Sequence, residues 1–288
     1  MAFGEGIVLR ILDRTSVKLD LPTLGMEGQT YETFKELITR PHGILLVTGP
    51  TGSGKTTTLY AALREIVSEE LKILTIEDPI EYYLGGVNQT QILPKIGLTF
   101  ARALRSFLRH DPDVVLVGEI RDKETAEVAI NASLTGHLVF STLHTNDAVT
   151  ATTRLLDMGV EPFLVSSSLE AVLAQRLVLV ICKYCKEEYV PENLTRLPPD
   201  FEYKKGQKLF RGRGCKECRN TGFAGRRALY ELLVMNDKLR EMVLKQASAS
   251  QLEQTARQHG LVLMREEGWR LARLGYTTPD EVLRVTKV

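Results

Sequence analysis

The stretch that decides the fold is Gly49-Pro50-Thr51-Gly52-Ser53-Gly54-Lys55-Thr56. It follows a short apolar run at residues 44–47 and opens a segment, residues 56–68, with apolar side chains at helical spacing. A G-x-x-x-x-G-K-T loop between a strand and a helix is the setting in which backbone N–H groups surround phosphates. The sequence therefore predicts a P-loop; the alternative is a glycine turn with an incidental lysine.

This loop supplies the residues that we expect to bind ATP. Lys55 reaches the β- and γ-phosphates, and the Thr56 hydroxyl oxygen is the hard ligand that Mg²⁺ prefers. The expected nucleotide-binding residues are Gly49, Pro50, Thr51, Gly52, Ser53, Gly54, Lys55, Thr56 and Thr57. ATP and Mg²⁺ are therefore the expected ligands of this end of the chain.

Short apolar runs alternate with helical patterns around the loop. The expected buried strands are residues 44–47, 73–76, 114–117 and 138–140. The expected helices are residues 56–68, 99–109, 123–134 and 147–157. Because parallel strands need such crossovers, we expect an α/β fold with a RecA-like P-loop NTPase core.

Acidic residues end two of the expected strands. Residues 113–119 form an apolar strand that ends in Glu119, the form of a Walker B segment with Glu at its tip. Glu77, Asp78 and Glu81 place three carboxylates within five positions after the strand at residues 73–76. Because like charges so close together are unfavourable without a cation or donors nearby, a functional role is favoured over a solvated acidic loop.

Two histidines bracket the expected strand at residues 138–140. His137 precedes it, and His144 follows it within Ser-Thr-Leu-His-Thr. Polar-flanked histidines at a buried strand can sense the γ-phosphate, although a lone histidine is more often structural. Both interpretations stay open from the sequence.

The four cysteines form a second site. Cys182, Cys185, Cys215 and Cys218 make two C-x-x-C pairs, and no cysteine lies outside the set. Each pair fits two thiolates on one tetrahedral metal, so we expect a zinc site whose four ligands leave no open position for catalysis. The alternative is a pair of disulfides, which a cytoplasmic enzyme disfavours.

Composition limits the partners. The 288 residues include 37 basic and 36 acidic side chains, so the chain lacks the overall positive field that non-specific nucleic-acid binding needs. Its longest purely apolar run, residues 177–182, is far below the roughly 20 residues that cross a bilayer. We therefore expect a cytoplasmic protein with no nucleic-acid partner.

Four motifs together carry a family resemblance: residues 49–56, 75–81, 116–122 and 135–145. In this order they resemble the motor ATPases of type II secretion and type IV pilus assembly. The resemblance implies that Glu81 is the catalytic carboxylate that polarises the attacking water, that Glu119 acts on Mg²⁺ or that water, and that His144 links nucleotide state to subunit movement. It also implies a homohexamer and an indirect association with the inner membrane through a platform protein and the pilus or secretion machinery.

The cysteine element refines the resemblance. Assembly and secretion members carry such a tetracysteine element, whereas the pilus-retraction members generally lack it. The sequence therefore resembles the assembly class, which implies extension or export.

The expected domains are residues 1–24, the end of an N-terminal α/β domain with a linker; 25–181, the RecA-like ATPase core; 182–225, the zinc-binding subdomain; and 226–288, a helical C-terminal region. Only about 40 residues precede the P-loop strand, whereas family members usually place a whole domain there. Arg10 lies where that domain supplies an arginine to the nucleotide site. We expect Arg10 either to stabilise γ-phosphate charge across a subunit junction or to be a solvated surface arginine.

Two further function classes remain open from the sequence. One is a nucleic-acid translocase that uses the same phosphate chemistry, which the balanced charge disfavours. The other is a nucleotide-binding scaffold without turnover, which the intact set of Lys55, Thr56, Glu81 and Glu119 disfavours.

Overall fold

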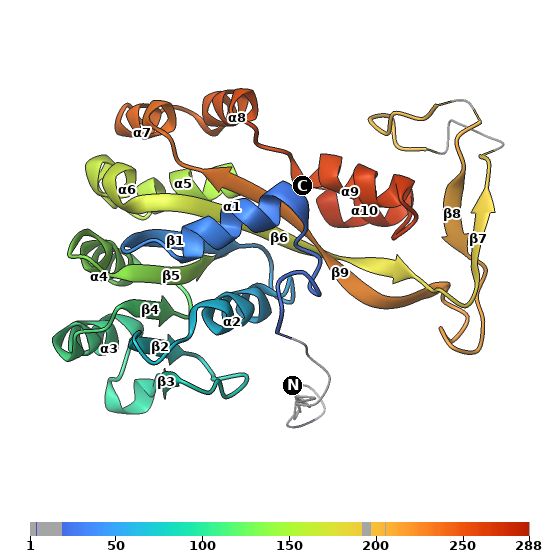
Figure 1. Ribbon diagram of the computed structural model, residues 1–288. Coiled ribbons are helices and arrows are strands. Elements are labelled where there is room, and N and C mark those ends of the chain that lie inside the picture. Colours follow the sequence, from blue (N-terminus) through green and yellow to red (C-terminus); the bar gives the residue numbers. More distant parts are fainter. Residues whose placement is uncertain (1–3, 5–18, 192–196, 205, 288) are drawn as a thin grey trace.

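A seven-stranded sheet forms the centre of the molecule, in a computed structural model that describes residue 4 and residues 19–191, 197–204 and 206–287 (Figure 1). The strand order is β3-β2-β4-β5-β1-β6-β9. The strands are β1 (Gly43–Thr48), β2 (Ile73–Glu77), β3 (Val87–Gln91), β4 (Val114–Val117), β5 (Leu138–Leu143), β6 (Leu169–Ile181) and β9 (Phe223–Val234). Neighbouring strands run parallel except β6 and β9, which are antiparallel.

Helices cover both faces of this sheet. They are α1 (Gly28–Ile38), α2 (Lys55–Ile66), α3 (Phe100–Phe107), α4 (Lys123–Leu134), α5 (Ala148–Asp157), α6 (Pro162–Ser168), α7 (Asp237–Leu244), α8 (Ala249–Gln258), α9 (Met264–Arg273) and α10 (Pro279–Thr286), with 3₁₀ turns η1 (Pro94–Ile96) and η2 (Leu108–His110). Alternate residues of β1 divide between two hydrophobic clusters, Ile44 and Leu46 in one and Leu45 and Val47 in the other. Burial on both faces explains why the central strands read as short, continuous apolar runs.

The expected α/β fold is confirmed, and its helices begin where capping residues place them. Asp122 accepts a hydrogen bond from the Thr125 N–H at the start of α4, and Asp147 does the same for Thr150 at the start of α5. The sequence predicted α4 at residues 123–134, as observed. Asp147, predicted as the first residue of a helix, is the cap residue before it.

A separate hairpin extends from the main sheet. Strands β6 and β9 run beyond the other strands and lead to β7 (Lys186–Tyr189) and β8 (Leu209–Gly212), which pair antiparallel (Figure 1). A small cluster that includes Phe201 and Trp269, with ring centroids 5.3 Å apart, packs this region against α9 and α10. The loop end of the hairpin, which carries Phe201, is therefore attached to the C-terminal helices.

The C-terminal helices also pack on the α/β core. Leu239 of α7 and Leu252 of α8 belong to the same hydrophobic cluster as residues of α4, α5 and α6. The four-part division of the chain stays a prediction, and Arg10 lies outside the described residues. Within the described part of the chain, no helix is long and apolar enough to cross a membrane.

Candidate functional site

The loop at residues 49–54 joins β1 to α2 and is shaped by glycine. Gly49 has φ +146°, and a Cβ there would lie 2.3 Å from the carbonyl oxygen of Gln175 on the neighbouring strand β6. The residue before α2 is Gly54, which has no side chain to occupy the free N–H groups of the first helical turn. The Ser53 Oγ is buried without a hydrogen-bond partner among the described residues. Unused donors and a positive helix end fit a phosphate group.

Lys55 is held in this loop by carbonyl oxygens. Its Nζ donates to the Gly49 oxygen at 2.9 Å and the Pro50 oxygen at 3.2 Å, and only 9% of the residue is exposed. Burial lowers the pKa of Lys55, and the negative charge of Glu119 opposes that shift. The ammonium group therefore lies at the edge of the loop, where an anion can replace the carbonyl oxygens as its partner.

A cavity of about 460 Å³ opens beside the loop. Its lining includes six of the predicted nucleotide-binding residues: Thr51, Gly52, Gly54, Lys55, Thr56 and Thr57. It also includes Glu77, Asp78, Glu81, Glu119 and His144, so both acidic segments and one histidine meet at the carboxyl ends of parallel strands. Gly49, Pro50 and Ser53 shape the loop behind this lining.

The acidic segment after β2 contains two different kinds of carboxylate. Glu77 is 3% exposed and accepts hydrogen bonds from Thr75, from the Tyr60 hydroxyl and from the Gln89 amide, the last at 3.1 Å. Glu81 is half-buried at the cavity, and its backbone N–H donates to the Tyr60 hydroxyl at 3.3 Å. Burial and the hydrogen bond to Glu77 raise the pKa of Tyr60. Tyr60 thus links a buried structural carboxylate to the segment that carries Glu81.

Glu119 lines the cavity from the loop after β4 and contacts this loop and the loop after β5. Its side chain is 14% exposed, forms an ion pair with Arg121 and lies 3.3 Å from the His144 Nε2. Arg121 also lies 4.0 Å from Asp78, and the hydrogen bond to Glu119 raises the pKa of Arg121. The sequence gives no particular reason to select Arg121, although it follows the predicted Walker B carboxylate by two positions.

The structure separates the two histidines. His137 lies at the amino end of β5, where its Nδ1 is 2.8 Å from the Ala132 carbonyl oxygen. The six residues of β5 span about 20 Å between it and His144. Of the two interpretations left open by the sequence, the position of His137 favours a structural role, because it does not line the cavity among the described residues.

Aromatic residues of the cavity were not predicted from the sequence. Tyr82 and Phe100 both line it, and the Tyr60 and Tyr82 rings meet edge to face at 6.2 Å between centroids. The only sequence feature that could have identified Tyr82 as a cavity residue is its position directly after Glu81. Phe100 comes from α3, which no motif marks.

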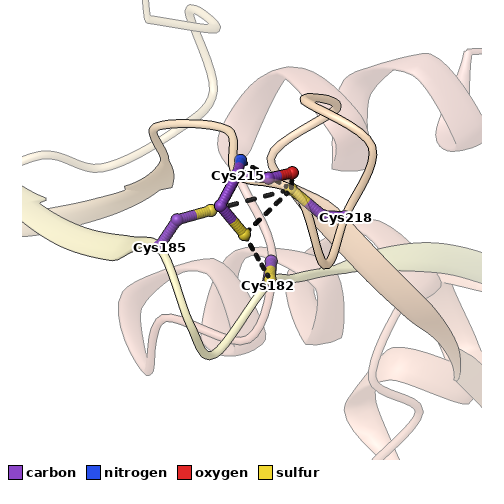
Figure 2. A group of neighbouring side chains, drawn as sticks. All are labelled: Cys182, Cys185, Cys215 and Cys218. Atoms are coloured by element: carbon purple, nitrogen blue, oxygen red, sulfur yellow. Dashed lines mark hydrogen bonds between the residues drawn. The ribbon is translucent and has the colours of Figure 1, made fainter.

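The four cysteine sulfurs point toward one another at the base of the hairpin (Figure 2). All four Sγ atoms lie within 4.8 Å of one another, and neighbouring pairs are 3.6, 3.8 and 3.9 Å apart. Four sulfurs on one tetrahedral zinc ion lie about 3.8 Å apart. The cysteines are free, which excludes the disulfide alternative. The donor set therefore fits zinc.

Backbone N–H groups donate to two of these sulfurs. The Cys185 Sγ accepts from the Gly214 N–H at 3.3 Å, and the Cys218 Sγ accepts from Cys215 and Gly222 at 3.2 and 3.3 Å. Burial alone would raise the pKa of the Cys218 thiol, but the backbone N–H groups of Cys215 and Gly222, together with the Cys215 and Cys185 thiols, lower it to about 6. Burial raises the pKa of the neighbouring Cys185 thiol instead. The surroundings therefore favour the thiolate, the form that binds a metal, at Cys218.

Known proteins share these features. A family model described as Type II/IV secretion system protein matches residues 1–284. The chain is 52% identical to the type II secretion system ATPase E of Vibrio cholerae over 284 residues, which are 99% of this chain and 56% of that protein. It is 49% identical to the type IV pilus assembly ATPase PilB of Thermus thermophilus, over 99% of this chain and 32% of that protein.

A solved structure supports the same assignment. The pilus retraction motor PilT with bound ADP aligns with a TM-score of 0.71 and 30% identity, over 97% of this chain and 69% of that one. The chain spans about half the length of the type II secretion relatives that it matches. With the family model covering nearly all of the sequence, the chain belongs to the type II/IV secretion system protein family.

Proposed function

We propose that this chain is the ATP-hydrolysing part of a motor that serves type II secretion or type IV pilus assembly. The observation that carries the proposal is the single cavity in which the P-loop, Glu81, Glu119 and His144 meet. The names of two relatives, a type II secretion ATPase and a type IV pilus assembly ATPase, support this activity and this class of machinery.

Each of these cavity residues has a separate role in ATP hydrolysis. Lys55 and the free N–H groups of α2 hold the phosphates of ATP. Thr56 is the residue that would hold Mg²⁺, which would supply positive charge to neutralise the phosphates. Glu81 accepts a hydrogen bond from the attacking water and so orients it in line with the γ-phosphate, and catalysis comes mainly from this positioning and from charge neutralisation.

Glu119 and its two partners form the second wall of the reaction site. Its contacts with Arg121 and His144 hold the carboxylate at the end of β4 and leave it at the edge of the cavity. His144 thereby joins the loop before α5 to the reacting groups. Arg10 of a neighbouring copy is the further residue that we propose for γ-phosphate charge.

The cysteine cluster has a structural role in this proposal. Cys182, Cys185, Cys215 and Cys218 hold one zinc ion, and their four thiolates leave no position for a reacting water. The proposed assembly is a homohexamer that meets an inner-membrane platform protein from the cytoplasmic side. Support for this assembly comes from the family and from the names of the relatives.

Two variants of the cavity test the proposed mechanism. Glu81→Gln removes a negative acceptor without changing size, so ATP hydrolysis should fall by about 10²-fold or more while ATP still binds. Lys55→Ala should instead weaken ATP binding itself by about tenfold or more, because a buried charged donor is lost. Steady-state hydrolysis and equilibrium ATP binding, with oligomer size recorded on the same samples, separate the two effects.

The matched control is Glu70→Gln, an exposed carboxylate on the loop between α2 and β2. It should leave both measurements unchanged. Normal hydrolysis by the Glu81→Gln variant would show that Glu81 does not orient the water. Binding without turnover in the unaltered chain would favour a nucleotide-binding scaffold.

A further inference from the structure

One buried carboxylate outside the nucleotide cavity joins two helix N-termini. Glu231 lies on β9 opposite Ala174 of β6 and is 3% exposed. Its Oε1 accepts the N–H of Ala148, the first residue of α5, at 2.9 Å. Its Oε2 accepts the N–H of Met264, the first residue of α9, also at 2.9 Å. Both oxygens are therefore committed, each to a different helix.

This position favours an ionised acidic side chain. Burial raises the pKa of Glu231, and the Ala148 and Met264 N–H groups oppose that rise. Two helix N-termini direct their partial positive charges at the same carboxylate, which favours its ionised form. An apolar side chain would leave both backbone donors buried without a partner. Glu231 thus fixes the start of α5 relative to the start of α9.

The first of these helices leads back to the nucleotide cavity. Residues 144–147 connect β5 to α5, and His144 within them lines the cavity and contacts Glu119. At one end the Thr145 N–H donates to the Thr48 hydroxyl at 2.9 Å, which ties this loop to the strand before the P-loop. At the other end the loop is held where Ala148 meets Glu231. The position of His144 therefore depends on both attachments.

The second helix leads toward the hairpin. After α9, the Tyr276 carbonyl oxygen accepts the Ile181 N–H at 2.8 Å, one residue before the first cysteine. The Thr277 hydroxyl donates to the Leu179 carbonyl oxygen at 2.8 Å. Glu231 therefore stands between the loop that carries His144 and the segment that supports the cysteine cluster.

We propose that Glu231 is a positioning residue that fixes the loop carrying His144 to α9, and that hydrolysis depends on it through His144. The proposal rests on the ATPase function proposed above. It assigns Glu231 no contact with the nucleotide, and its effect must therefore disappear when His144 is removed.

The test is a double-variant cycle with Glu231→Gln and His144→Ala. Glutamine has one carbonyl oxygen and one amide group, so it can accept only one of the two N–H groups. Glu231→Gln should lower kcat between about tenfold and 10²-fold, because a small misplacement suffices, and should leave the KM for ATP within about twofold. In the His144→Ala background the same substitution should lower kcat by less than about twofold further.

The chain offers a matched control in Glu281. It is 6% exposed and accepts the Leu179 N–H at 2.9 Å, but it connects α10 to β6 and has no contact with the loop at residues 144–147 among the described contacts. Glu281→Gln should change kcat by the same factor with and without His144. If Glu231→Gln behaves like this control, or if its effect multiplies with that of His144→Ala, the proposal is overturned.

A second variant tests the proposal if the Glu231→Gln protein does not fold. Met264→Pro removes one N–H donor at the first position of α9, where proline is tolerated, and keeps the carboxylate. It should reproduce the fall in kcat and its dependence on His144, and independent effects would contradict the proposal.

Hydrogen exchange separates failure of this proposal from failure of the ATPase function. Adding ATP to the unaltered chain should slow exchange of the Ala148 and Met264 amides together, and Glu231→Gln should abolish the change at Met264. This readout needs no turnover. Exchange at Met264 that is insensitive to ATP would overturn the positioning role even in an active enzyme.

Discussion

The nucleotide cavity and the cysteine cluster are both built on loops between regular elements, but their side chains are satisfied in different ways. In the cavity, Lys55 is bonded to carbonyl oxygens of its own loop, and Glu119 is paired with Arg121 and His144. In the cluster, four sulfurs face one another, and those of Cys185 and Cys218 accept backbone N–H groups (Figure 2). On the function proposed above, Lys55 exchanges its carbonyl partners for phosphate when a nucleotide binds, whereas the cysteines form a complete ligand set for one ion. One site is arranged to change and the other to remain constant.

Metal removal should give the largest effect. A zinc ion would supply most of the free energy that orders the base of the hairpin, because small zinc sites are commonly unfolded without their metal. Stripping the metal with a chelator, or making Cys218→Ser, should release β7 and β8 to rapid amide exchange and leave β1 and β5 protected. Metal analysis should find one zinc per chain before treatment and none after it.

If the purified chain contains no zinc and its hairpin is nevertheless protected, the cysteine cluster is not a metal site that orders the hairpin. If the stripped chain still binds ATP, the two sites are independent in binding. If removal of the metal abolishes hydrolysis but not ATP binding, the cysteine cluster supports the reaction in the nucleotide cavity.

Sequence reasoning was strongest where local chemistry decides the structure. The P-loop, the helix at residues 123–134 and the four-cysteine set follow from spacing and from residue type, because turn glycines, caps and ligand pairs act over a few positions. Spacing could not show which carboxylate of residues 77–81 is buried. Glu77 is held in the interior by hydrogen bonds from Tyr60 and Gln89, which are distant in the sequence.

Long-range pairing accounts for the elements that sequence reasoning missed. β3 reads Val-Asn-Gln-Thr-Gln and has no apolar run, so its place beside β2 comes from pairing at the sheet edge. β6 begins at Leu169, well before the apolar run at residues 177–182, and is set by its partners β1 and β9. Glu231 could not be selected either, because its two partners are 83 and 33 residues away.

Alanine at two P-loop glycines should give the next largest effect. Gly49→Ala places a Cβ 2.3 Å from a backbone oxygen at φ +146°, so it should lower the free energy of unfolding by more than about 2 kcal/mol. Gly52 has φ +80° with no atom within 4 Å of its Cβ position, so Gly52→Ala should cost only about 1 kcal/mol. Gly52 lines the cavity, however, and its new methyl group should still weaken ATP binding.

Urea unfolding and equilibrium ATP binding on the same samples check both statements. The expected pattern is one variant that loses mainly stability and one that loses mainly binding. Equal stability losses would mean that the close approach of Gly49 to β6 has no energetic consequence. Unchanged ATP binding by Gly52→Ala would mean that the nucleotide does not use this wall of the loop.

The smallest effect should come from an exposed ion pair on the hairpin. Arg211 and Glu187 are directly opposite each other on β8 and β7, with 2.8 Å between Nε and Oε1, and their side chains are 60% and 33% exposed. Water and salt screen such a pair, so Glu187→Gln should reduce stability by less than about 1 kcal/mol. Glu217→Gln, an exposed carboxylate between the last two cysteines, is the control. Thermal unfolding and zinc content should be nearly the same for both variants. Because the cross-strand pair contributes so little, a loss as large as that caused by metal removal would mean that ion pairs, and not the cysteines, hold the hairpin together.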